Sequence, residues 1–169
     1  MNDLPSDTLR YTSLQRRLHW LVIVLVFVQY LAQETMGEAM RVIEQHEPVN
    51  AGHFFVITIH TWFGALLAAV MIWRWTLRRR PVPVNGGLMA RHRARYVAIH
   101  HKILYLTIIL MALTGALHYY AGLPTAGRWH ELGKWLLLVL IAIHVLGALS
   151  HVRGGSGVLR QMMGRGSLR

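Results

Sequence analysis

The stretch RWHELGKWLLLVLIAIHVLGALS, residues 128–150, carries two histidines, His130 and His144, that are fourteen residues apart. In an α-helix this separation amounts to about four turns and roughly 21 Å of rise, which puts both imidazoles on one helix face. The hydrocarbon core of a bilayer is about 30 Å thick. The stretch therefore predicts a membrane-spanning helix with one imidazole near each side of the core.

The composition is typical of a membrane protein. Of the 169 residues, 54% are hydrophobic, yet the formal net charge is +11, so apolar blocks must be segregated from basic ones. A basic chain of this size could instead bind nucleic acid through a patch of arginines. The long apolar blocks argue against that class, and we expect no nucleic-acid partner.

Four apolar spans are present, at about 18–35, 54–77, 97–121 and 132–150, and each is close to the length that crosses a bilayer. No repeat or separate soluble domain interrupts them, which predicts a single membrane domain over residues 1–169, an all-α four-helix bundle. The first span is short and follows Arg16 and Arg17, so a signal peptide is the alternative. No small-residue cleavage site follows it, which favours a retained helix.

Charge on the connecting segments predicts the orientation, because positive residues collect on the cytoplasmic side. One side holds fifteen of the eighteen Lys and Arg residues: Arg10, Arg16, Arg17, Arg74, Arg78, Arg79, Arg80, Arg91, Arg93, Arg95, Lys102, Arg153, Arg160, Arg165 and Arg169. With Asp3 and Asp7 this side has a net charge of +13, whereas the opposite side, with Arg41, Arg128, Lys134 and five glutamates, has −2. Both termini are therefore predicted to be cytoplasmic.

The absence of cysteine limits the chemistry of the spans. Without thiols the chain cannot form disulfides, hold an iron–sulfur cluster by thiolates, attach a c-type haem or use a thiol nucleophile. Any iron must be held by histidine or methionine.

Four histidines form two pairs at matching depths. His19 opens the first span from the cytoplasmic side, and His144 approaches that side near the end of the last span. His60 lies near the outer end of the second span, and His130 opens the fourth span from the outside. Because bis-histidine ligation suits haem iron in electron transfer, the pairs predict two b-type haems. His19 and His144 would hold an inner haem, and His60 and His130 an outer haem.

Single histidines have other interpretations. An amphipathic ring often anchors a helix end at the headgroup level, so His19 or His130 alone could be an interfacial anchor. His60 and His144 lie in the apolar interior, where an imidazole without a partner is costly. His101, at the start of the third span, also reaches the inner level and is an alternative inner ligand. Interior histidines could also relay protons in a small transporter.

Weaker features fit the ligand scheme as well. Gly64 and Gly147 lie on the ligand faces and could leave room for a porphyrin, although close helix packing explains them nearly as well. Arg74 reaches the inner level, where it could offset a haem propionate or snorkel to the surface. The predicted connections hold His46, His53 and His92, which are expected to be solvated.

Taken together, these motifs resemble those of the bacterial cytochrome b561 family of four-helix, haem-b membrane proteins. The resemblance covers about Tyr11 to Met163 and includes the intervals between motifs as well as the residue types. It is carried by Tyr11-Thr-Ser-Leu-Gln-Arg-Arg-Leu-His19-Trp20, by Ile59-His60 with Gly64 and Arg74, by His101 with Tyr105 and Gly115, and by Trp129-His130-Glu131 through His144 to His151. The family implies two b haems and exchange of electrons with the quinone pool, and His19, His60, His130 and His144 match its ligand positions.

The resulting hypothesis is a di-haem b electron-transfer protein of the bacterial inner membrane that exchanges electrons with ubiquinone or a related quinone. Some family members resemble superoxide oxidases that pass the electron to ubiquinone, but the outer segment from Glu34 to Glu47 is acidic and would repel an anion. A cytochrome b anchor for a soluble redox partner is a further alternative. A polar pocket around His101, Lys102 and Arg16 is the candidate quinone site.

Overall fold

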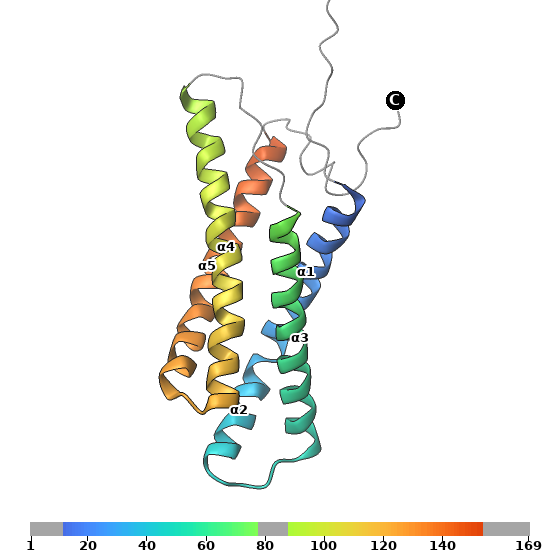
Figure 1. Ribbon diagram of the computed structural model, residues 1–169, viewed down its shortest axis with the longest axis vertical. Helices are drawn as coiled ribbons and strands as arrows, with labels where there is room; N and C mark the ends of the chain where they lie inside the picture. The colour runs from blue at the N-terminus through green and yellow to red at the C-terminus, as the bar shows by residue number, and fades with distance from the viewer. Residues whose placement is uncertain (1–11, 78–87, 154–169) are drawn as a thin grey trace, which may run out of the picture.

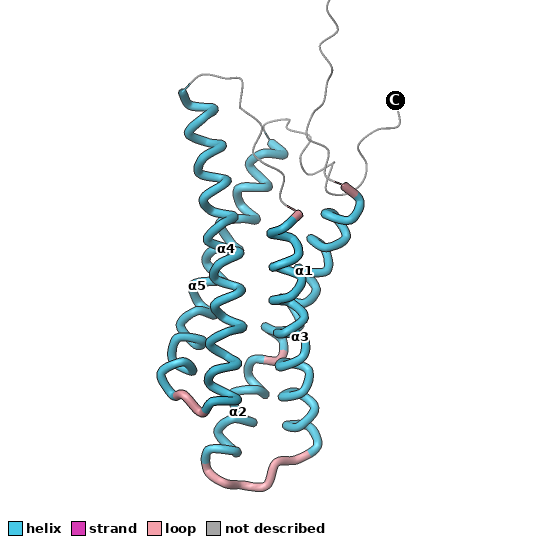
Figure 2. Tube along the Cα trace, in the orientation of Figure 1, coloured by secondary structure: helices cyan, strands magenta, loops and turns pink. Residues whose placement is uncertain are grey.

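The computed structural model describes residues 12–77 and 88–153, which form five α-helices (Figures 1 and 2). These are α1 (Ser13–Leu31), α2 (Gln33–Glu44), α3 (Ala51–Thr76), α4 (Leu88–Ala121) and α5 (Pro124–Arg153). Four of them, α1, α3, α4 and α5, are long and apolar enough to cross a membrane. The predicted all-α, four-helix membrane bundle is therefore confirmed.

The helix ends are arranged as an even number of spans requires. α1 begins, α3 ends, α4 begins and α5 ends at one end of the bundle, the upper end in Figure 1. Which side of the membrane this end faces stays a prediction. Several charged residues and one motif residue used in the predictions lie outside the described ranges: Arg10, Tyr11, Arg78, Arg79, Arg80, Arg160, Arg165 and Arg169, with Asp3 and Asp7.

Two of the spanning helices, α4 and α5, begin well before the predicted apolar segments. α4 starts at Leu88 rather than near residue 97, and its first turns project past the neighbouring helices (Figure 1). Arg91, Arg93 and Arg95 are exposed there. Hydropathy marks only the part of a helix that lies in hydrocarbon, so a polar helical extension gives no apolar signal.

The sharp turn between α4 and α5 has a local cause in Gly122 and Pro124. Gly122 has φ +62°, and the Leu123 N–H donates to the Leu117 carbonyl at 3.4 Å, which closes the end of α4 with a left-handed residue. Pro124 then begins α5, at the first helical position where its missing N–H costs nothing. This turn makes α4 and α5 antiparallel neighbours.

The predicted acidic connection after the first span is largely helical. α1 ends at Leu31, and α2 follows after a break at Ala32 (Figure 2). α2 packs on α3 through its buried Ala39 and Val42, while Glu34 and Glu38 are exposed. The sequence prediction missed this helix because its apolar face is narrow and its mean polarity is that of a loop.

Hydrogen bonds tie the start of α1 to the end of α3. The Thr12 hydroxyl accepts from the Gln15 N–H at 3.2 Å, and the Gln15 side chain accepts from the Thr12 N–H at 3.0 Å, which is a capping box. The Gln15 amide also donates to the Leu77 carbonyl at 2.9 Å, and the Arg74 guanidinium donates to the Gln15 carbonyl at 2.8 Å. α1 is thereby fixed against the end of α3.

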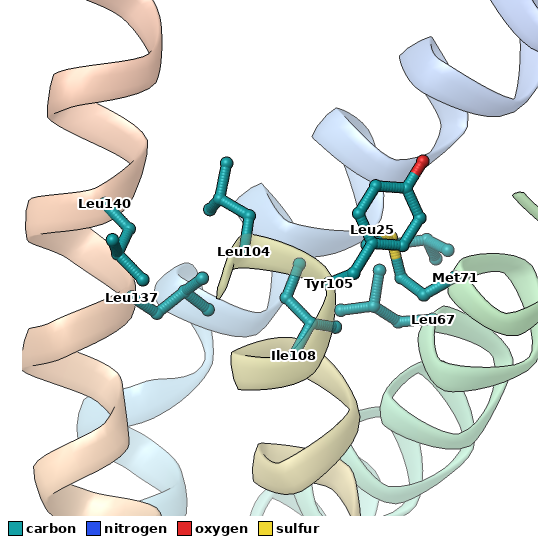
Figure 3. Packing of buried hydrophobic residues seen from close by; sticks show 8 residues of the cluster. All are labelled: Leu25, Leu67, Met71, Leu104, Tyr105, Ile108, Leu137 and Leu140. Carbon is teal, nitrogen blue, oxygen red and sulfur yellow. The ribbon is translucent and has the colours of Figure 1, made fainter. Parts of the chain in front are cut away.

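The apolar core lies between the two halves of the bundle, where side chains of four helices meet (Figure 3). α4 packs closely along α5, α1 packs along α3, and α3 joins the two pairs by its contact with α4. The buried cluster consists of Leu25 from α1, Leu67 and Met71 from α3, Leu104, Tyr105 and Ile108 from α4, and Leu137 and Leu140 from α5. Large apolar side chains such as Phe27, Trp62 and Leu146 point outward, 62%, 70% and 65% exposed, as expected of a surface that faces lipid.

Candidate functional site

α5 carries one member of each predicted histidine pair. His130 and His144 lie on this single uninterrupted helix, so their separation along its axis is roughly 21 Å. Leu137 and Leu140 of the apolar core lie between them. The helix therefore holds two imidazoles at opposite depths with an apolar layer between.

The structure brings both predicted pairs together. The rings of His60 on α3 and His130 on α5 have centroids 6.0 Å apart and an interplanar angle of 74°. Those of His19 on α1 and His144 on α5 have centroids 6.3 Å apart and an angle of 63°. Each pair thus bridges the α1–α3 half and the α4–α5 half of the bundle.

The spacing of the rings leaves room for one metal ion between the two imidazoles of each pair. An imidazole nitrogen binds a metal such as zinc at about 2 Å, which puts the centres of two rings on opposite sides of an ion about 6 Å apart. Rings stacked face to face could not both direct a nitrogen at the ion, and neither pair is stacked. Among the described residues no three His, Cys, Asp or Glu side chains converge on a metal position. A haem needs only two protein ligands, since the porphyrin supplies the other four.

The ring of His130 is fixed by α4. Its Nδ1 lies 2.8 Å from the Met111 carbonyl oxygen, and because a carbonyl can only accept, Nδ1 carries the proton and Nε2 keeps a lone pair for a metal. A Cβ at Gly115 would lie 3.0 Å from two atoms of this ring. The glycine therefore leaves room for the imidazole against α4, whereas the sequence had pointed to Gly115 only as part of the family resemblance.

Gly64 and Gly147, the two glycines expected to make room for a porphyrin, have different surroundings. A Cβ at Gly64 would lie 3.6 Å from the side-chain nitrogen of Gln29, which is ordinary contact with α1. A Cβ at Gly147 would meet nothing within 4 Å. Among the glycines in the described ranges, Gly115 alone is in close contact with a ligand candidate.

Two further histidines, both on α4, lie next to His144. The His101 ring centroid lies 5.0 Å from that of His144, and His100 stacks on His144 at 5.9 Å with an interplanar angle of 10°. The His101 Nδ1 also lies 2.7 Å from the Val97 carbonyl oxygen. The distance from His101 to His144 is shorter than the spacing of about 6 Å for two ligands of one ion, which favours His19 as the partner of His144.

Arg74 lies beside the inner pair. Besides its bond to the Gln15 carbonyl, the guanidinium is close enough to His19 and His144 to interact with both electrostatically. A cation in that position suits an anionic group such as a propionate, and it also holds α1 to α3.

The expectation that His53 is solvated is wrong. His53 lies on α3, only 9% exposed, with its Nε2 3.9 Å from a Glu38 carboxylate oxygen of α2. The packing of α2 over the start of α3 covers it. His46 and His92 are exposed, and His92 lies on α4 rather than in a connection.

Two polar side chains near the outer pair were missed by the sequence analysis. The Tyr30 hydroxyl donates to the Lys134 carbonyl of α5 at 2.7 Å, and the Gln29 amide donates to the His60 carbonyl at 3.0 Å. The available signal was their position within an apolar span, where a polar side chain needs a partner.

Comparison with known proteins identifies a family for the chain. The family described as prokaryotic cytochrome b561 matches residues 10–165. A protein of Cereibacter sphaeroides named cytochrome b562 is 28% identical over 142 residues, which cover 83% of this chain and 86% of that protein. No solved structure matches the chain.

Proposed function

Because the chain belongs to the prokaryotic cytochrome b561 family, we propose that it is a di-haem b electron carrier of the bacterial inner membrane that exchanges electrons with the quinone pool. Family membership and the four apolar helices make it a multi-pass membrane cytochrome b, with haem-based electron transfer as its activity. The proposal adds the number of haems, their ligands and the quinone.

The observation that carries the proposal is the repetition of one arrangement at two depths. His19 with His144, and His60 with His130, have nearly equal ring separations of 6.3 and 6.0 Å and non-stacked orientations. An isolated interfacial anchor has no reason to meet a second imidazole, and two such meetings on one helix support two centres of the same kind.

The chain's own residues would hold, orient and insulate two haems. His60 and His130 are the ligands of the outer haem, and His19 and His144 those of the inner haem. Bound haem supplies the one-electron redox chemistry. The Met111 carbonyl sets the His130 tautomer, and the apolar cluster between the two levels excludes water from the space between the centres.

The inner end supports a quinone site. His101 is half-buried beside His144, exposed Lys102 follows it on α4, and half-buried Arg16 lies about one turn before His19 on α1, so polar hydrogen-bonding groups occur at this end of the bundle. A quinone needs such groups for its oxygen atoms and an apolar surface for its ring and tail. We assign the exchange of electrons with quinone to this end of the protein.

Haem content per chain tests the proposal directly. Purified protein analysed as the pyridine haemochrome should contain two b haems per chain, both extracted by acidic organic solvent because no cysteine can tether them. Reduction of both haems by ubiquinol in membranes should accompany this result. One haem per chain would remove one histidine pair, and a chain without haem would refute the function.

A further inference from the structure

Gln29 is an amide in the apolar segment of α1, and it lies against the candidate outer ligand His60. Its side-chain nitrogen donates to the backbone carbonyl of His60 at 3.0 Å. Since a carbonyl can only accept, the atom that faces it must be the nitrogen, and the Gln29 Oε1 is fixed as an acceptor on the other side of the amide.

Each of these two residues has one buried polar atom without a hydrogen-bond partner among the described residues. These atoms are the Gln29 Oε1 and the His60 Nδ1. An unmet donor or acceptor in a dry interior costs about 1–3 kcal/mol. The Gln29 Oε1 is an acceptor, and the His60 Nδ1 becomes a donor when His60 binds a metal through Nε2.

The histidine across the pair already shows the complete arrangement. The His130 Nδ1 has its acceptor in the Met111 carbonyl at 2.8 Å. Histidines that bind metals usually donate their second N–H to an oxygen, which fixes the tautomer and raises the basicity of the ring. The His60 Nδ1 has no such oxygen among the described residues, and the Gln29 side chain, which is bonded to the His60 carbonyl, carries a buried oxygen that has no partner there.

We propose that Gln29 is the positioning residue of His60: its side-chain oxygen accepts the His60 Nδ1–H, directly or through one buried water, and so tunes the outer haem. This inference rests on the proposed function, because it takes His60 as a haem ligand. A single water with two polar partners is a sufficient bridge where the atoms are not in direct contact.

The proposal gives opposite effects for two substitutions of nearly equal shape. Gln29→Met removes the acceptor, which makes the His60 ring a weaker electron donor, raises the midpoint potential of the outer haem and speeds its loss about 10- to 100-fold. Gln29→Glu supplies a stronger acceptor and lowers that potential. A role limited to joining α1 and α3 would move the potential in the same direction in both variants.

Gln33 provides the matched control. It lies one turn further along the chain, on α2, and its Oε1 is also buried with no hydrogen-bond partner among the described residues. Gln33→Glu brings the same negative charge to the neighbourhood without an oxygen fixed at His60. An equal drop in potential in Gln33→Glu and Gln29→Glu would reduce the effect to a general electric field and overturn the proposal.

The experiment is a redox titration of both haems in the full-length protein, wild type and four variants: Gln29→Met, Gln29→Glu, Gln33→Met and Gln33→Glu. The near-infrared charge-transfer band of the oxidised outer haem is recorded in parallel, because it follows electron donation by the axial imidazoles. Transfer of haem to apomyoglobin measures its loss. The expected result is opposite shifts of the outer haem in the two Gln29 variants, an unchanged inner haem and small effects in the Gln33 variants.

The haem content of the wild type distinguishes a failure of the Gln29 proposal from a failure of the proposed function. A wild type with two haems whose outer haem is unaffected by either Gln29 variant overturns the role of Gln29 and leaves the proposed function intact. A wild type that lacks the outer haem overturns both. If Gln29→Met does not accumulate, Gln29→Glu against Gln33→Glu still decides, because a shift confined to Gln29→Glu is required.

Discussion

At the scale of single residues, Gly115 couples the packing of α4 to the ring of His130. A Cβ there would come within 3.0 Å of the imidazole, so Gly115→Ala should push the ring from its place at a cost of about 1–3 kcal/mol. We expect a weakened low-spin signal from the outer haem, an intact inner haem and a lower melting temperature. Gly147→Ala is the control, since nothing lies within 4 Å of its Cβ. Equal spectra for the two variants would contradict this role of Gly115.

The four histidines should behave as two independent ligand pairs. His60→Ala should abolish low-spin ligation of the outer haem and spare the inner one, because within the described ranges the His60 ring contacts that of His130 and no other. His144→Ala should do the reverse. Electron paramagnetic resonance of the oxidised protein distinguishes the two centres. Loss of both centres from either substitution in a protein that still folds would separate the observed ring pairs from haem ligation.

His101 is the test of the inner pair. His101→Ala should retain the inner low-spin signal if His19 is the partner of His144, whereas His19→Ala should lose it. The separation of 6.3 Å between His19 and His144, against 5.0 Å between His101 and His144, is the reason for this order. The opposite order of losses would assign the inner haem to His101.

Among the helices, α2 carries the charges that an ionic electron donor would meet at its end of the bundle. Glu34, Glu38 and Glu44 are exposed on it, against a single exposed Arg41. Superoxide should therefore reduce the haems slowly at low salt, with no fall in rate as salt is added, since attractive steering gives fast association that salt suppresses. Neutral ubiquinol should reduce them with little salt dependence. Stopped-flow reduction across a salt series measures both.

Fast reduction by superoxide that drops steeply with ionic strength would mean that local charge at the haem entrance outweighs α2. A superoxide oxidase would then replace the electron carrier as the best description. Reversing the charge of α2 by Glu34→Lys and Glu38→Lys serves as the control, because it should speed the superoxide reaction and leave the quinol reaction unchanged.

The same elements explain what could be predicted from the sequence. The spans were predictable because hydropathy and length respond to the hydrocarbon layer, and the depths of His19, His60, His130 and His144 follow from the helical rise. The polar start of α4 and the whole of α2 were not, because neither presents a long apolar run.

Contacts around the candidate site were harder to predict than the histidines themselves. The acceptor for His130 is the main-chain carbonyl of Met111, which every residue possesses and no side-chain pattern can single out. Burial of His53 depends on α2 folding back over α3. Such features need the tertiary arrangement, whereas Gln29 and Tyr30 could have been noted as polar groups at membrane depth.

The molecule as a whole consists of two helix pairs that lie side by side, and histidines meet between them at two depths of the membrane. α1 packs with α3 and α4 with α5, and α5 faces both members of the other half through His19 and His60. The Tyr30 hydroxyl adds a hydrogen bond to the Lys134 carbonyl on the same boundary. Ligands bound between the pairs would therefore stabilise the fold by binding the assembled halves better than separated ones.

The charges at the two ends of the bundle predict its direction in the membrane. The side with net charge +13 should be cytoplasmic and the side with −2 external, because positive residues near the spans are retained inside. The chain has no cysteine, so single cysteines can report the topology without background. Glu44→Cys at the end of α2 and Arg93→Cys on the extension of α4 are both exposed positions at opposite ends.

In intact spheroplasts a membrane-impermeant maleimide should label Glu44→Cys and leave Arg93→Cys unlabelled until the membrane is opened with detergent. The unsubstituted chain gives the blank, and labelling of both variants in detergent shows that each cysteine is reactive. The reverse pattern would exchange the inner and outer assignments of the two histidine pairs. It would leave the pairs themselves unchanged, since their depths relative to each other follow from α5 alone, but it would move the candidate quinone site beside His144 to the external face.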